Sequence, residues 1–544
     1  MQAQTTTAPE PPRTRSERRA PKARASRRRL GIVLVAIVLV PLVASAVNMI
    51  VRGGSYHPWG DLALFELSVR DVGHHAVLVG AYSRFGWWHP GPLEFYLLAV
   101  PYRLVAEWSG GLALGALLIN GAAIAGIAYV AHRRAGTRLV LWALLVTMLL
   151  IRTFGTNAAR NPWNPYVTVV PCLLVILLGW SLVEGDRWSA PLFAATGTFL
   201  VQAHVEYAPL VGVLGIGGLV VLVVRELRGH GRAGLRTVAA PLGISLAIAV
   251  VLWIPPVVDQ VTNQPGNLGV LIRFFREHHP GHSASVAYHV VARELSWRPS
   301  WLVHWGPIHA ATGEVDTSRA PLPFALLAIA AALVATWRRA PSARNLLLVV
   351  LASWAVGFWS VTHVVGPLYP YLLRWLDALG AATWLAIGWA VWSVLPRRRQ
   401  NAFAPALAIV LVTGLVAASV VATVAAARSP IPYAAQSRTL TKLQKPVLAA
   451  ARGKNGVVVV RRDDSAYAAA TVSGVMLMLE RHGIPARVDA RHDPALQVLY
   501  DPRRLYDGQP VRAVLTVTAG GKAPPGSGTP VATADGVSVL RSEG

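Results

Sequence analysis

Acidic, basic and aromatic residues are concentrated between the first two long apolar runs of the chain. Asp61 and Glu66 follow the first run closely, and Arg84 and His89 precede a short segment of mixed polarity. A carboxylate in this place could deprotonate a hydroxyl group, and the cations could stabilise charge developing on a phosphate leaving group. The alternative is an ordinary solvated loop at a membrane surface. This stretch is therefore the first candidate for chemistry.

A second polar segment, residues 160–166, reads Arg-Asn-Pro-Trp-Asn-Pro-Tyr and opens another apolar run. The amide groups of Asn161 and Asn164 could donate and accept hydrogen bonds with a sugar, and Trp163 could stack on its ring. An interfacial aromatic anchor followed by a proline helix start explains the same residues equally well. We therefore treat the three residues as candidate substrate ligands.

Two more polar groups lie at the ends of apolar runs. His204, Glu206 and Tyr207 separate two runs, where a polar cluster is costly unless it has a purpose. They could position an acceptor, and His204 and Glu206 could bind a divalent metal, although a His-x-Glu pair alone is a weak metal pattern. Arg374 stands three residues before Asp377 and could reach a lipid phosphate, a structural ion pair being the alternative. The sequence therefore leaves a divalent metal cofactor open.

The composition excludes several classes of protein. Of the 544 residues, 54% are hydrophobic and 14% are charged, whereas soluble domains carry about 25% charged residues. The mean hydropathy of +0.45 and the long charge-free runs indicate an α-helical polytopic membrane protein. The net charge of +25 favours basic cytoplasmic loops over a nucleic-acid partner. A single cysteine, Cys172, excludes an intramolecular disulfide.

Eleven apolar runs are long enough to be considered as membrane spans. They cover residues 30–50, 112–131, 138–152, 165–183, 190–203, 208–225, 236–256, 321–338, 344–363, 368–395 and 402–427. Basic clusters lie between alternate pairs of runs. This pattern predicts that the clusters and the N-terminus lie on the cytoplasmic side of a cell membrane. Segment 91–107 would add a twelfth span and reverse this topology. Because it holds two prolines and three charges, we predict an amphipathic or re-entrant segment at the outer surface.

The chain divides into three parts. Residues 1–29 are expected to be a disordered basic cytoplasmic tail. Residues 30–427 form the transmembrane domain, with outer loops at 51–111 and 257–320. In the second loop Trp297, Trp301 and Trp305 are spaced by four, as on one helical face. Residues 428–544 are expected to be an outer α/β domain, with strands at 457–460 and 511–517 and a helix at 466–482.

The first outer loop resembles that of the GT-C glycosyltransferases, close to the protein O-mannosyltransferase and aminoarabinose-transferase type. Gly60-Asp61 matches the acidic position after the first span. The run from His89 to Tyr96 matches the proline-rich motif that opens a surface helix, and the next span ends in His132-Arg133-Arg134 as in that family. The resemblance is good over about 85 residues and elsewhere concerns the architecture alone.

The resemblance implies an inverting transferase that uses a polyprenyl-phosphate sugar as donor and an outward-facing active site. Asp61 would be the general base, and Arg84, His89 and Arg374 would hold the phosphate. The family often has two adjacent acidic residues, whereas Asp61 is followed by Leu62. Glu66 would lie about 140° around a helix from Asp61, so the two carboxylates would not share a face. Glu66 could therefore bind acceptor or pair with Arg70.

The acceptor would be a cell-envelope glycan, lipid or protein, and an actinobacterial source fits the arginine-rich composition. Two other classes explain the spans as well: a multi-pass lipid or solute transporter and a non-catalytic scaffold for envelope assembly. The concentrated acidic and aromatic loop favours the transferase over both.

Overall fold

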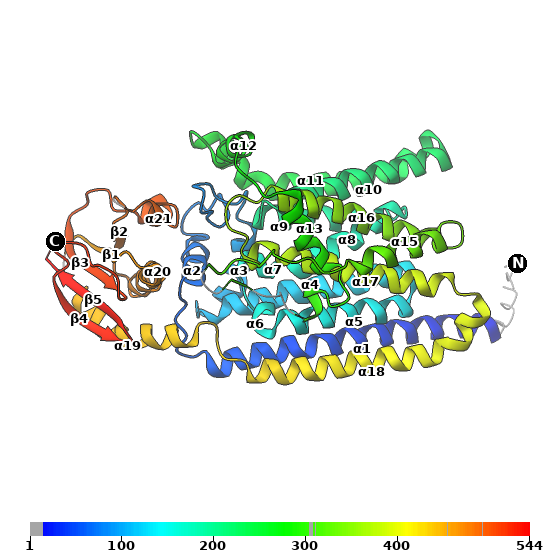
Figure 1. Cartoon of the computed structure of the whole chain (residues 1–544), viewed down its shortest axis with the longest axis horizontal. Coiled ribbons are helices and arrows are strands. Elements are labelled where there is room, and N and C mark those ends of the chain that lie inside the picture. The colour runs from blue at the N-terminus through cyan, green and yellow to red at the C-terminus, as the bar shows by residue number, and fades with distance from the viewer. Residues whose placement is uncertain (1–14, 304–307, 310–311, 454, 492, 544) are drawn as a thin grey trace, which may run out of the picture.

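The computed structural model describes residues 15–303, 308–309, 312–453, 455–491 and 493–543. A bundle of long helices makes up most of the molecule, and a small sheet lies beyond one end of it (Figure 1). The described chain begins at the opposite end of the bundle. The short helices near the sheet carry the candidate site, so this end of the bundle is called the sheet end below.

Each of the eleven apolar runs lies on a helix or a pair of helices. The long helices are α1 (Arg15–Arg52), α4 (Gly110–Ala135), α5 (Thr137–Phe154), α7 (Asn164–Val167) continued by α8 (Val169–Val183), α9 (Ser189–Ala203), α10 (Tyr207–His230), α11 (Arg232–Thr262), α15 (Phe324–Thr336), α16 (Pro341–Thr362), α17 (Arg374–Val394) and α18 (Arg397–Arg428). Within the described residues, seven helices are long and apolar enough to cross a membrane. The helical membrane class is confirmed, and the count of eleven spans stays a prediction.

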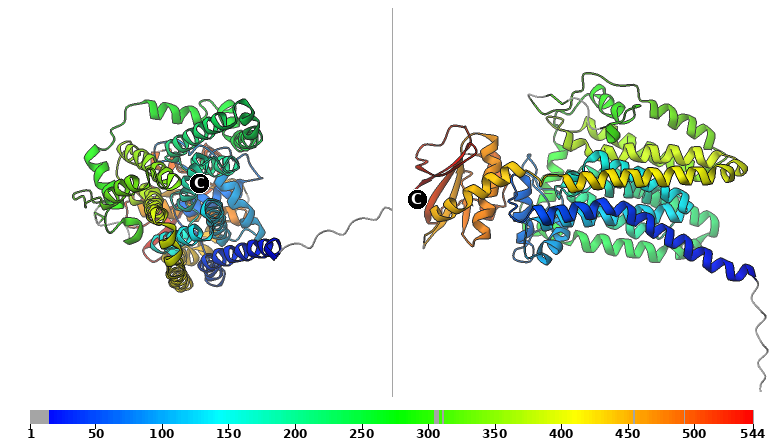
Figure 2. Two further views of the ribbon diagram at one scale, coloured as in Figure 1. Left: turned by 90° about the vertical axis from the view of Figure 1, so that its right-hand side faces the viewer. Right: turned by 90° about the horizontal axis from the view of Figure 1, so that it is seen from below.

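The loops that carry the basic clusters lie far from the sheet. Figures 1 and 2 show the α10–α11, α15–α16 and α17–α18 connections at the end of the bundle where α1 begins. Arg338, Arg339 and Arg397 in these connections are exposed. The arrangement separates basic loops from the candidate site along the long axis of the bundle.

Short helices cover the sheet end. They are α2 (Asp61–Asp71), α3 (Leu93–Leu104), α6 (Thr156–Ala159), α12 (Asn267–Arg276), α13 (Ala284–Glu294), α14 (Ser300–Val303) and the 3-10 helix η1 (Pro370–Leu373). Segment 91–107 contains the 12-residue helix α3. At 1.5 Å per residue this helix is about 18 Å long, well below the roughly 30 Å of a hydrocarbon core. It supplies no further span.

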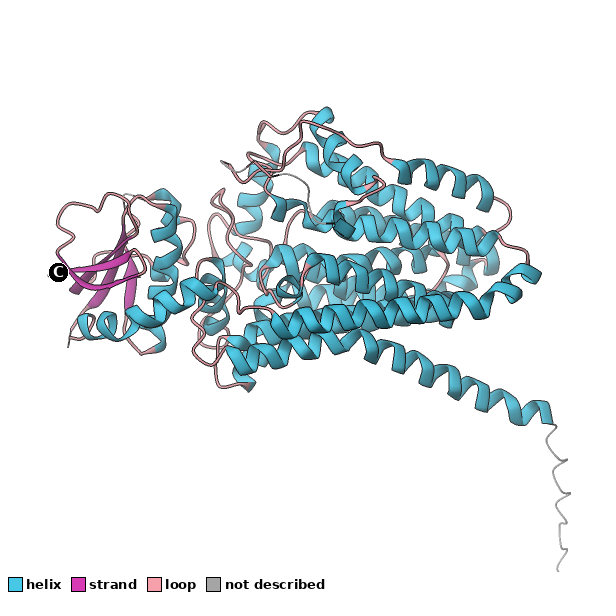
Figure 3. Ribbon diagram, turned by 60° about the horizontal axis from the view of Figure 1, so that its bottom comes forward, coloured by secondary structure: helices cyan, strands magenta, loops and turns pink. Residues whose placement is uncertain are grey.

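The C-terminal part is a mixed five-stranded sheet with helices against it (Figure 3). Strands β1 (Val457–Arg462), β2 (Ala486–Val488), β3 (Val511–Thr518), β4 (Thr529–Ala534) and β5 (Val537–Ser542) lie in the order β2-β1-β3-β5-β4. The accompanying helices are α19 (Ala434–Ala450), α20 (Ala466–Arg481), α21 (Pro494–Gln497) and η2 (Pro502–Arg504). The strands expected at 457–460 and 511–517 and the helix expected at 466–482 are confirmed. Strands β2, β4 and β5 and helix α19 were not predicted from the sequence.

Candidate active site

Asp61 is the first residue of α2 and lies at the sheet end of the bundle. Its half-buried carboxylate accepts a hydrogen bond from the hydroxyl group of Tyr82. Burial raises the pKa of Asp61 above its usual value, and the Tyr82 hydrogen bond opposes that rise. A raised pKa makes the ionised carboxylate a stronger proton acceptor. Asp61 therefore has the properties of a general base.

The C-terminal part of the chain holds the backbone immediately before Asp61. Gly60 donates its N–H to the carbonyl of Ala470 at 3.1 Å and accepts from the Ser473 hydroxyl at 3.1 Å. The Trp59 indole N–H donates to Thr471 at 3.1 Å. All three partners belong to α20. The start of α2 is thereby fixed against a helix from the other end of the sequence.

Arg84 supplies an exposed cation in the same region. Its guanidinium donates to the carbonyl of Val365 at 2.7 Å and lies 5.6 Å from the centre of the Tyr369 ring. Among the described residues it forms no ion pair with a carboxylate. A guanidinium with free donors suits a phosphate group, which it can bind through two hydrogen bonds.

Tyr371 connects Asp61, Arg84 and the second polar segment. The Tyr371 hydroxyl interacts electrostatically with both Asp61 and Arg84. Its ring lies 5.0 Å from that of Trp163 and 5.7 Å from that of Tyr369. Residues from α2, the first loop, the start of α7 and η1 therefore meet at one place. Aromatic rings around a few polar groups are typical of small-molecule sites.

Tyr82, Tyr369 and Tyr371 were not predicted as site residues. The Pro-Leu-Tyr-Pro-Tyr run at 367–371 was the available signal, because paired tyrosines beside prolines precede an apolar run there. Tyr433 also interacts with the Asp61 charge, and its ring lies 5.2 Å from Trp59. The backbone φ angle of Tyr433 is +49°, a conformation that non-glycine residues rarely adopt.

His89, His204 and Glu206 form a second group next to Arg84. The two imidazole rings lie 4.3 Å apart, and Nδ1 of His204 lies 3.6 Å from a carboxylate oxygen of Glu206. Nδ1 of His89 accepts the backbone N–H of Val205 at 3.2 Å. Burial lowers the pKa of His89 and lowers the pKa of His204 to about 4, so both are neutral at pH 7. His89 therefore provides no permanent charge for a phosphate.

The carboxyl group of Glu206 has a raised pKa. Burial raises its pKa to about 8, against the opposing effect of the Arg84 charge. Within the described residues no group of three or more His, Cys, Asp or Glu side chains is arranged to hold a metal. His204 and Glu206 would supply only two ligands. The neutral imidazole of His204 could bind a metal as it is, whereas the carboxyl group of Glu206, with its raised pKa, would first have to lose a proton.

Four further candidates have partners that are not substrate. Asn161 accepts the backbone N–H of Trp163 at 3.0 Å, and buried Asn164 donates to the carbonyl of Ala203 at 2.8 Å. Tyr207 donates to Thr168 at 2.9 Å within the helix bundle. Arg374 lies 3.4 Å from Asp377, as the structural alternative expected. These contacts fix the helices that surround the site.

The side chains of Glu66 and Asp61 lie on different sides of α2. It is fully buried, accepts the Tyr102 hydroxyl at 2.8 Å and pairs with Arg481 of α20. The alternative that Glu66 pairs with Arg70 is wrong, because Arg70 instead pairs with Glu107 at 2.7 Å. The tertiary partners Arg481 and Glu107 replace the local helical one.

A long helical bundle, short surface helices at one end and a mixed sheet beyond them make up the fold of this chain. Two crystal structures of ArnT from Cupriavidus metallidurans, one in the apo state and one bound to undecaprenyl phosphate, share it. Each is 16% identical to this chain, with a TM-score of 0.54, and the match covers 93% of this chain and 97% of ArnT. No family model and no curated protein matches the sequence.

Proposed function

We propose that this chain is a membrane glycosyltransferase that moves a sugar from a polyprenyl-phosphate donor to an acceptor hydroxyl outside the cytoplasm. The observation that carries the proposal is that the half-buried carboxylate of Asp61, held by Tyr82, and the exposed guanidinium of Arg84, beside Tyr369, lie in the same region at the sheet end. A carboxylate of raised pKa and a cation without a carboxylate partner among the described residues are thereby available at one end of the bundle. The shared fold of an ArnT structure that holds undecaprenyl phosphate adds support for the donor.

In the proposed reaction Asp61 takes the proton of the acceptor hydroxyl. The hydroxyl oxygen attacks the anomeric carbon, and the bond from that carbon to the phosphate oxygen breaks. The product inverts at the anomeric carbon, and the polyprenyl phosphate leaves with the bonding electrons. Arg84 stabilises the negative charge that develops on the leaving phosphate. Trp163 and Tyr371 would stack on the transferred sugar, and neutral His89 would donate a hydrogen bond to the donor.

Arg84→Gln should weaken polyprenyl-phosphate binding about tenfold, because a charge-assisted pair is replaced by neutral hydrogen bonds. Titration of undecaprenyl phosphate into the purified full chain, followed by native mass spectrometry, measures the change. Arg103→Gln is the matched control, since Arg103 is also exposed and also donates to a backbone carbonyl. Equal affinities of the two variants for undecaprenyl phosphate would show that Arg84 does not bind the phosphate.

Tyr82→Phe should move the acid limb of the transfer rate upward by about one pH unit. The Tyr82 hydrogen bond stabilises the Asp61 carboxylate and holds its pKa down, so its loss raises that pKa further. Asp61 must be ionised to act as base, so the rate falls as pH drops through this pKa. The rate at alkaline pH should change less than the rate at pH 5. A uniform loss at every pH would show that Tyr82 does not act through Asp61.

Envelope analysis of a clean deletion strain tests the function as a whole. A transferase predicts the loss of one sugar from an envelope glycan and accumulation of its polyprenyl-phosphate donor. The wild-type chain should restore both. An unchanged glycan together with an unchanged donor pool would contradict the proposal and favour the scaffold or transporter.

A further inference from the structure

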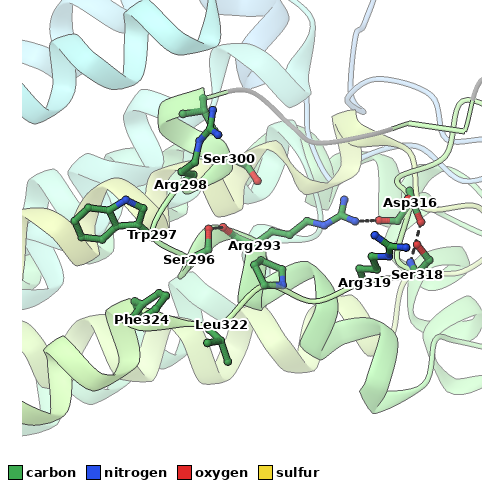
Figure 4. A pocket seen from close by; sticks show the side chains of 12 residues that line it. Arg293, Ser296, Trp297, Arg298, Ser300, Asp316, Ser318, Arg319, Leu322 and Phe324 are labelled. Atoms are coloured by element: carbon green, nitrogen blue, oxygen red, sulfur yellow. Dashed lines mark hydrogen bonds between the residues drawn. The ribbon is translucent and has the colours of Figure 1, made fainter.

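A cavity of about 670 Å³ lies beside the start of α15 and contains none of the residues of the candidate active site (Figure 4). Its walls come from the end of α13, the stretch that leads into α14 and the stretch before α15. Arg293, Arg298 and Arg319 line it together with one carboxylate, that of Asp316. The cavity therefore carries an excess of positive charge.

The positive charge of this cavity is only partly compensated within the described residues, because Asp316 is the single carboxylate in its lining. Arg293 is 8% exposed and donates to the backbone carbonyl of Asp316, while its Nη1 has no partner. The Asp316 carboxylate already accepts the backbone N–H of Ser318 at 2.8 Å. Exposed Arg298 and Arg319 form no ion pair with any described residue. A buried guanidinium group needs a partner of opposite charge that accepts its hydrogen bonds. Phosphate is such a partner, because it matches the geometry of the arginine side chain.

The rim of the cavity is apolar and open. Trp297 is 74% exposed and Leu322 is 70% exposed, and Phe324 is also exposed. The helix that starts here, α15, exposes Leu327 and Val334 along its length. Exposed aliphatic residues on an apolar helix of a membrane protein face lipid, and tryptophan is enriched at the lipid–water interface. An anion that enters here arrives beside hydrocarbon chains.

The tryptophan spacing in this loop was misread from the sequence. Trp297 and Trp301 do not share a helical face, because α13 ends at Glu294 and α14 begins at Ser300. Trp301 is buried, whereas Trp297 is exposed at the cavity. Trp305 lies outside the described residues. Trp297 and Arg298 both lie on the stretch between these two helices, where both side chains are exposed.

We infer that this cavity binds the phosphate group of an anionic membrane phospholipid, with its acyl chains against Trp297, Leu322 and α15. Arg293 and Arg319 lie at one end of the cavity and Arg298 at the other (Figure 4). The inference concerns a second lipid site and does not depend on the proposed transferase activity.

Native mass spectrometry of the delipidated full chain tests the inference, with dioleoylphosphatidylglycerol as the probe. The double variant Arg298→Gln/Arg319→Gln should lower the affinity for this lipid about tenfold, since each basic residue contributes to attraction of anionic lipid. Both side chains are exposed, so thermal unfolding should be unchanged. Arg338→Gln/Arg339→Gln, at the other end of α15, removes the same charge and should leave the affinity near that of the wild type.

Three results would overturn the inference. Equal losses in the two double variants would mean that net charge alone attracts the lipid. Displacement of the lipid by an equal concentration of inorganic phosphate would mean that the cavity takes a free anion. Preferential binding of undecaprenyl phosphate, lost in Arg298→Gln/Arg319→Gln, would assign the cavity to the donor.

Discussion

Replacing Asp61 with asparagine should reduce sugar transfer by about a thousandfold while the protein still folds. General base catalysis contributes about 10² to 10⁴ in rate, and an amide cannot take the acceptor proton. Asparagine has the shape of aspartate, and its amide oxygen can still accept the Tyr82 hydroxyl. Binding of the donor phosphate at Arg84 should therefore change little.

Complementation of the deletion strain measures this effect, with envelope glycan analysis and quantitation of the protein in the membrane. Asp535→Asn is the control, because Asp535 is an exposed carboxylate on a turn of the sheet. It should restore the glycan fully. Restoration of the glycan by Asp61→Asn would show that Asp61 is not the general base, whatever the result for the Arg84 variant. Loss of both the glycan and the membrane protein would be a folding defect, and donor binding by the purified variant distinguishes the two.

Replacing Arg504 with methionine should destabilise the docking of the C-terminal part by about 3 kcal/mol. Arg504 is buried and bridges Asp71 of α2 and Glu480 of α20, each at 2.7 Å. Methionine leaves both carboxylates without their shared cation. Because α20 also holds Gly60 and Trp59, a weaker contact should loosen the start of α2.

Hydrogen exchange of α2 and α20 and denaturant unfolding measure this loss. Arg503→Met is the matched control, because the Arg503 side chain is 40% exposed and lies 3.4 Å from Asp71. An exposed pair contributes at most about 1 kcal/mol. Equal destabilisation by the two variants would contradict the structural role assigned to Arg504. Faster exchange in α20 without a change in α2 would show that the two helices are not coupled.

The helices of the bundle were predictable because they depend on local composition. Every apolar run became helical, since an apolar segment satisfies its backbone hydrogen bonds internally. The helix expected at 466–482 has Val472, Val475, Met476 and Leu479 buried, as its periodicity indicated. Strands β4 and β5 were missed because their apolar alternation is weak, although they pair with each other across the two-residue turn Asp535-Gly536.

The sequence by itself determined the membrane class, the position of Asp61 after the first span and the neighbouring cation Arg84. These are properties of short segments, where hydropathy and residue type are sufficient. Only the tertiary structure decided that Tyr82 binds Asp61, that Tyr369 lies beside Arg84, and that Glu66 pairs with Arg481 instead of Arg70. The physical reason is that a buried carboxylate takes whichever cation the packing of distant helices brings to it, and spacing along one helix does not report that packing.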